Sequence, residues 1–127
     1  MESLGQRSGQ AQQAAGPVDA AGDPAQEYTE LVLDLVAQIP PGRASSYGAI
    51  ADAARVLTGR GSARTVGRIM AIGGGQVPWW RVVPVTGVVP EHLRERARVH
   101  LREEGTPMRS SDPLRLDMAR AGWEPSI

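Results

Sequence analysis

The chain of 127 residues contains no Cys, no Phe and no Lys, and its formal net charge is zero. Without Cys it has no disulfide, no thiolate metal ligand and no cysteine nucleophile. No run of about 18 apolar residues occurs in it, so we expect no membrane span and a cytoplasmic location.

The length suits one domain of ordinary size, but the first residues do not fit a core. Residues 1–26 consist largely of Gly, Gln, Ala, Ser and Pro, which predicts a disordered tail. They also lack the apolar stretch of a secretory signal. We therefore expect the domain to span residues 27–106. Residues 107–127 are expected to dock on it as an extension, through two leucines and Trp123.

The basic residues are all Arg and are unevenly distributed. Between Pro41 and Pro90 six arginines stand against a single acid, Asp52, which gives this segment a net charge of +5. A basic segment in a neutral chain indicates a polyanionic partner such as nucleic acid. The alternative is an arginine-biased composition that only supplies solvated surface charge.

Three helices are predicted in the first half of the domain. Residues 28–39 carry apolar side chains at helical spacing, and the Pro-Pro-Gly that follows ends the pattern. Ser46 and Ser62 can cap two further helices, over 47–57 and 63–72. The inner face of the first of these two is expected to contain Ile50, Ala53, Ala54 and Leu57.

The order of elements indicates a DNA-binding fold. Arg64 and Arg68 lie four residues apart and share one face of the third helix. Two β-branched runs on either side of the Thr86-Gly87 dipeptide predict a small β-hairpin, and a charged helix is expected over 90–104. This order predicts a mainly α, winged helix-turn-helix fold whose second helix enters a DNA groove. A small helical core with an arginine-rich face is the alternative.

Three sequence blocks between Ile39 and Gly105 resemble the DNA-binding domain of the O6-alkylguanine-DNA alkyltransferases. "IPPGRASSYGAIADAA" is similar to the signature that opens this domain, and "SARTVGRIM" to its recognition helix. "VPWWRVV" stands where the family has its active-site "PCHRV". The match extends more weakly into "GWEP" near the C-terminus.

The departures from the family motif indicate that the chain is not an enzyme. Trp79 occupies the position of the alkyl-accepting Cys, and Trp80 that of the His that activates it. An indole is neither a nucleophile nor a base at neutral pH, so direct alkyl transfer is excluded. We see no Ser/His/Asp arrangement, metal cluster or phosphate loop, and we expect no cofactor. His92 and His100 are expected at the surface rather than as ligands.

The resemblance also implies which residues bind DNA. Tyr47 would press on the phosphate beside the target nucleotide, and Arg64 would fill the gap that the rotated base leaves. The full set implied for DNA binding is Tyr47, Ser45, Ser46, Arg64, Thr65, Gly67 and Arg68. The set implied for the lesion pocket is Pro78, Trp79, Trp80 and Tyr47, with Arg81 in a structural role. Core packing stays open as an alternative for both tryptophans.

A Trp in the Cys position resembles the alkyltransferase-like proteins, which bind O6-alkylguanine without repairing it. They pass the lesion to nucleotide excision repair and usually keep the motif "PWHR", whereas this chain reads "PWWR". The resemblance implies a monomeric damage sensor that binds O6-alkylguanine in double-stranded DNA by base flipping. The alternative is a winged-helix DNA-binding or regulatory protein whose second indole fills the pocket.

Overall fold

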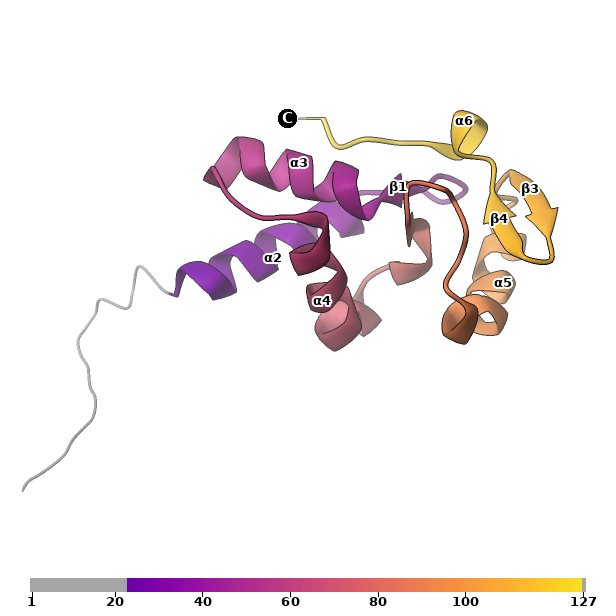
Figure 1. Ribbon diagram of the computed structural model, residues 1–127, viewed down its shortest axis with the longest axis horizontal. Helices are drawn as coiled ribbons and strands as arrows, with labels where there is room; N and C mark the ends of the chain where they lie inside the picture. The colour runs from indigo at the N-terminus through magenta and orange to yellow at the C-terminus, as the bar shows by residue number, and fades with distance from the viewer. Residues whose placement is uncertain (1–22, 127) are drawn as a thin grey trace, which may run out of the picture. The chain divides into compact units, whose positions relative to one another are not determined.

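The computed structural model describes residues 23–126, so most of the predicted disordered tail lies outside the described residues (Figure 1). Helix α2 (Pro24–Ala37) begins inside the segment 1–26 that we expected to be irregular. Asp23 explains this start, because its carboxylate accepts a hydrogen bond from the backbone N–H two residues later. Within the described range no helix has the length and apolarity needed to cross a membrane.

The predicted helix-turn-helix is formed by α3 (Tyr47–Thr58) and α4 (Ala63–Gly73), which follow each other in Figure 1. Both predicted caps are confirmed, since Ser46 and Ser62 each accept a hydrogen bond from the backbone N–H three residues later. Gly59 ends α3 in a left-handed conformation, with a φ of 79°, which a Gly adopts without strain. The caps and the glycine therefore fix where each helix begins and ends.

The inner face of α3 differs from the predicted one in its last turn. The buried residues of this helix are Ile50, Ala51, Ala53 and Ala54. Leu57, which we expected on the same face, is 52% exposed. Because Ala51 is buried as well, the packed face is rotated toward it. The position seven residues after Ile50 therefore reaches solvent.

A short pair of strands connects the start of the helix-turn-helix to the tryptophan motif. Strand β1 (Ser45–Ser46) pairs in parallel with β2 (Val82–Val83). Strand β2 directly follows the 3₁₀ helix η2 (Trp79–Arg81). The pairing therefore fixes η2 beside Tyr47, the first residue of α3.

The β-hairpin lies elsewhere than predicted. It consists of the antiparallel strands β3 (Met108–Ser111) and β4 (Leu114–Leu116), near the C-terminus. The runs around Thr86-Gly87 do not form it, because Pro84 has no N–H for a ladder. Instead the Gly87 carbonyl and the Val89 N–H form hydrogen bonds of 2.9 Å with the backbone of β4. The second run thus pairs with β4 rather than with the first.

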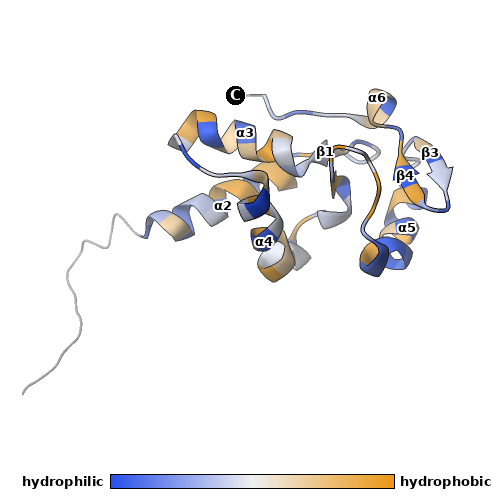
Figure 2. Cartoon of the chain, viewed as in Figure 1, coloured by the Kyte–Doolittle hydropathy of each residue, from blue (hydrophilic) through white to orange (hydrophobic). Residues whose placement is uncertain are grey.

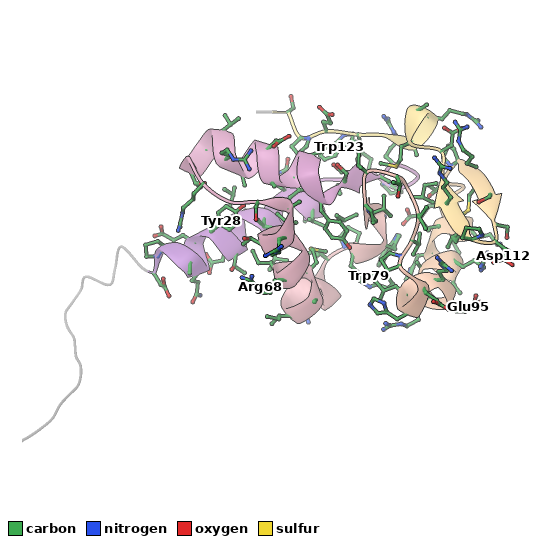
Figure 3. All side chains as sticks on the ribbon, in the orientation of Figure 1. Tyr28, Arg68, Trp79, Glu95, Asp112 and Trp123 are labelled. Atoms are coloured by element: carbon green, nitrogen blue, oxygen red, sulfur yellow. The ribbon has the colours of Figure 1, made fainter. Side chains whose placement is uncertain are left out.

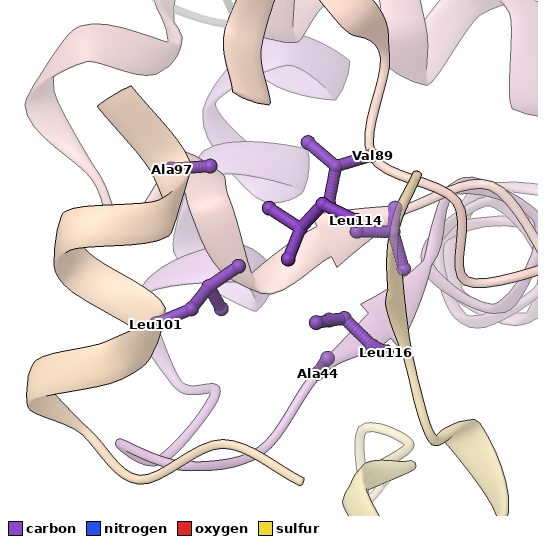
Figure 4. Packing of buried hydrophobic residues seen from close by; sticks show 7 residues of the cluster. Ala44, Val89, Ala97, Leu101, Leu114 and Leu116 are labelled. Carbon is purple, nitrogen blue, oxygen red and sulfur yellow. The ribbon is translucent and has the colours of Figure 1, made fainter. Parts of the chain in front are cut away.

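One hydrophobic cluster joins the tryptophan segment, helix α5 (Arg94–Glu103) and the hairpin (Figure 4). Its buried members are Ala44, Val83, Val89, Ala97, Leu101, Leu114 and Leu116. In Figure 2 the colour along β4 changes from hydrophobic to hydrophilic and back, because Arg115 points outward between two buried leucines. Both Trp79 and Trp80 pack against the cluster. The C-terminal segment, with helix α6 (Met118–Ala121), continues from the hairpin.

Candidate nucleic-acid interface

A cavity of about 570 Å³ opens between helix α4 and the start of helix α5. Its walls are mainly apolar and come from six elements: α3, α4, η2, α5 and the 3₁₀ helices η1 (Gly74–Gln76) and η3 (Glu91–Leu93). The described lining residues are Tyr47, Gly67, Met70, Ala71, Ile72, Gly74, Gly75, Trp79, Pro90, His92, Leu93 and Arg96. In Figure 3 the Trp79 label lies between α4 and α5. A volume of this size is typical of a site for a small molecule or a single base.

Tyr47 lies at the edge of this cavity, at the N-terminus of α3. Its side chain is half-buried, and burial raises the pKa of the phenol above its ordinary value of 10.0. Tyr47 is therefore a neutral hydroxyl at physiological pH and can donate a hydrogen bond to an anionic oxygen.

The two adjacent tryptophans face different surroundings. Trp79 lines the cavity, whereas Trp80 does not. The Trp80 ring stacks on His100, with centroids 3.7 Å apart and planes 8° from parallel. Its indole N–H donates a 3.0 Å hydrogen bond to the carboxylate of Glu104. These two contacts turn Trp80 away from the cavity, so its predicted place in the pocket wall is not observed.

Arg81 and Glu104 form a largely buried ion pair beside Trp80, with 12% and 13% of their side chains exposed. Arg81 also donates a 2.7 Å hydrogen bond to the Ile39 carbonyl. Burial alone would raise the pKa of Glu104, but hydrogen bonds from Arg81, the Gly42 N–H and Trp80 together lower it below its ordinary value of 4.5. Glu104 is thus a carboxylate that holds three segments of the chain together.

The predicted recognition helix presents its basic residues to solvent. Arg64 and Arg68 are exposed on α4, and neither is paired with a carboxylate in the part of the chain that the structure describes. Figure 3 labels Arg68 on this helix. A Cβ added at Gly67 would meet no atom within 4 Å, so the helix surface between the two arginines is open. Thr65 is half-buried, and its N–H is bonded to the helix cap.

The remaining predicted residues lie apart from the cavity. Ser45 is 1% exposed in strand β1, so its hydroxyl cannot reach DNA in this conformation. Ser46 caps α3 and faces a different hollow, beside Trp123. Pro78 is half-buried and precedes η2 without lining the cavity. The structure therefore unites Tyr47, Gly67 and Trp79, and separates them from the two serines.

Sequence reasoning missed the contributions of Arg96, His100 and Glu104. The Arg96 guanidinium lies 5.6 Å from the centre of the Trp79 ring, and His100 stacks on Trp80 rather than being a solvated surface residue. These three residues are four positions apart in sequence, which places them on one side of a helix. That spacing was the signal from which their shared location could have been predicted. Among residues 23–126 no group of His, Asp and Glu is arranged to hold a metal ion.

The family model of the 6-O-methylguanine DNA methyltransferase DNA-binding domain matches residues 27–106. The chain belongs to this family. A DNA base-flipping protein of Vibrio parahaemolyticus serotype O3:K6 (strain AQ3810) is 30% identical over 103 residues. That match covers 78% of this chain and 98% of the relative.

Two solved structures from S. pombe are also similar to this chain. One is S. pombe Atl1 in complex with damaged DNA containing O6-carboxymethylguanine, with a TM-score of 0.66 and 29% identity. The other is S. pombe ATL in complex with DNA, with a TM-score of 0.65 and 30% identity. Each match covers 79% of this chain and 97% of the other. The predicted family resemblance and the mainly helical fold with a small hairpin are confirmed.

Proposed function

We propose that this protein is a damage sensor that binds O6-alkylguanine in duplex DNA by base flipping, without transferring the alkyl group. The observation that carries the proposal is the cavity that joins Tyr47, Gly67 and Trp79 beside the exposed arginines of α4. In this proposal Arg64 enters the base stack, Arg68 contacts a phosphate, and the alkylated base lies against Trp79. The relatives named above support it, since one is a base-flipping protein and another holds damaged DNA.

The open cavity favours lesion binding over a winged-helix regulator that has lost its pocket. That alternative rests on a second indole filling the space, but Trp80 is directed at His100 and Glu104. Apolar walls suit an alkyl group, because each buried CH₂ gains about 0.8 kcal/mol.

The lesion remains in the DNA in this proposal. The sequence has no Cys, and so no thiolate that could accept the alkyl group. We therefore propose that the bound protein marks the site for nucleotide excision repair. We also propose that the protein binds the lesion as a monomer.

The test compares the affinity of the full chain for one duplex that carries O6-methylguanine, a bulkier O6-alkylguanine or plain guanine at the same position. Fluorescence anisotropy at fixed salt should show tighter binding to both lesions. Mass spectrometry of the oligonucleotide after incubation should find the alkyl group still on the DNA. Equal affinities for the three duplexes would remove the proposal.

The variant Arg64→Ala should weaken lesion binding about fivefold or more, because a side chain stacked among bases contributes about 1–3 kcal/mol. Arg120→Ala is the matched control, since Arg120 is exposed on α6, outside the cavity and the recognition helix. A control variant that loses as much affinity as Arg64→Ala would show that Arg64 supplies only charge.

A further inference from the structure

The charge of the cavity is unevenly distributed. Arg96 and His92 are its basic lining residues, and no described carboxylate lines it. Arg96 makes no ion pair with a carboxylate of the described chain, although Glu95 is its neighbour in sequence. Glu95 instead pairs with Arg98. One end of an otherwise apolar pocket therefore carries an uncompensated positive charge.

The position of Arg96 is defined by its contact with Trp79. Its guanidinium lies over the indole ring, 5.6 Å from the ring centre. A cation over the face of Trp is attracted by the negative charge of the π system, and the contact leaves the N–H groups of the fork available. Arg96 can therefore donate hydrogen bonds to a group that lies against Trp79.

We infer that Arg96 sets the specificity of the pocket, and that it favours O6-alkyl groups that end in a carboxylate over neutral groups of the same size. The inference rests on the proposed function, since it assumes that the alkylated base enters this cavity. O6-carboxymethylguanine is the simplest lesion of this class, and its carboxylate is ionised at neutral pH. An arginine binds a carboxylate through two parallel hydrogen bonds, a geometry that a neutral amide or alkyl group does not complete.

The expected preference is moderate, because Arg96 is exposed to solvent. An exposed pair of opposite charges contributes up to about 1 kcal/mol, which corresponds to about a fivefold difference in affinity. The duplex with the charged lesion and the duplex with the neutral lesion have the same phosphates. General attraction to DNA therefore cancels in the ratio of the two affinities.

The experiment measures the dissociation constants of the full chain for three duplexes of one sequence. They contain O6-carboxymethylguanine, its neutral carbamoylmethyl amide, or plain guanine. The wild type should bind the carboxylate lesion about fivefold more tightly than the amide. Arg96→Gln should reduce this ratio to about one. Arg96→Lys, which keeps the charge but loses the planar fork, should give a ratio between that of Arg96→Gln and that of the wild type.

Arg102→Gln is the matched control, because it removes the same charge from an exposed position of the same helix, outside the cavity. It should leave the ratio unchanged. The assignment of Arg96 is overturned if the wild type binds the carboxylate and amide lesions equally, or if Arg96→Gln keeps the wild-type preference. Either result overturns it even when both lesions bind more tightly than guanine. An Arg96→Gln variant that loses affinity equally for all three duplexes identifies a phosphate contact and overturns it too. If neither lesion exceeds guanine, the proposed function itself fails.

Discussion

At the scale of single residues, the adjacent side chains of Trp79 and Trp80 in the 3₁₀ turn η2 have different roles, one in the cavity wall and one in packing. The rings of Trp79 and Trp80 are 87° from parallel, with centroids 5.6 Å apart. The 3₁₀ turn directs one indole at the cavity and the other at His100 and Glu104. The half-buried Trp80 N–H donates its hydrogen bond to the Glu104 carboxylate. A hydrogen bond to a charged group contributes about 1.5–3 kcal/mol to stability.

The variant Trp80→Phe tests this division between the two rings. It keeps an aromatic ring for the stack on His100 but removes the N–H donor to Glu104. We expect the free energy of unfolding in urea to fall by about 1.5–3 kcal/mol, and the preference for lesion over plain DNA to remain. Trp123→Phe is the control, because within residues 23–126 the Trp123 indole N–H has no hydrogen bond to lose. A folded Trp80→Phe protein without lesion preference would show that Trp80 belongs to the pocket.

At the scale of elements, Glu104 connects three segments around the site. It follows helix α5, accepts hydrogen bonds from Trp80 and Arg81 at η2, and accepts another from the Gly42 N–H in the turn before β1. This arrangement holds η2 against the segment that leads into α3. The carboxylate therefore maintains the shape of the cavity without touching what enters it.

The lowered pKa of Glu104 predicts how stability depends on pH. Because the folded protein holds this carboxyl group ionised more strongly than the unfolded chain does, its contribution is fully present above pH 4.5. It is lost as the pH falls from there through the lower folded pKa. Glu104→Gln should cost on the order of 2 kcal/mol at pH 7 and should flatten the acid limb of the stability curve. Urea unfolding of both proteins between pH 3 and 7 measures this, and parallel curves would contradict it.

The elements that could be predicted from sequence are those that local chemistry determines. Ser46 and Ser62 cap their helices by hydrogen bonds within three residues, so the cap residue alone identified both starts. The hairpin was misplaced because the partner of the Val88-Val89 run lies far along the chain, in β4. The orientation of Trp80 likewise depends on Glu104, 24 residues away. Contacts between distant residues decided both of these cases, which the local sequence pattern could not show.

At the scale of the whole molecule, the net charge of +5 between residues 41 and 90 overstates what is available to DNA. Arg43 donates hydrogen bonds to the carbonyls of Ala121 and Gly122, and Arg81 is buried against Glu104. Arg55 pairs with Asp52. Arg43, Arg55 and Arg81 are thus engaged by the protein itself, whereas Arg64 and Arg68 on α4 are exposed and can meet phosphates.

The salt dependence of DNA binding should reflect this smaller number of free charges. Each neutralised phosphate contributes about −0.9 to the slope of log K against log salt, so we expect a slope of about −2 to −3, compared with about −4.5 for five contacts. Arg68→Ala should reduce the magnitude of the slope by about one, because it removes one phosphate contact from α4. Arg120→Ala should leave the slope unchanged, since Arg120 lies outside the cavity and the recognition helix. Anisotropy titrations of one duplex between 50 and 200 mM salt (the range over which such contacts are roughly resolved) give the slope. A steep slope that Arg68→Ala does not alter would mean that the engaged arginines are released on DNA, and that the protein rearranges when it binds.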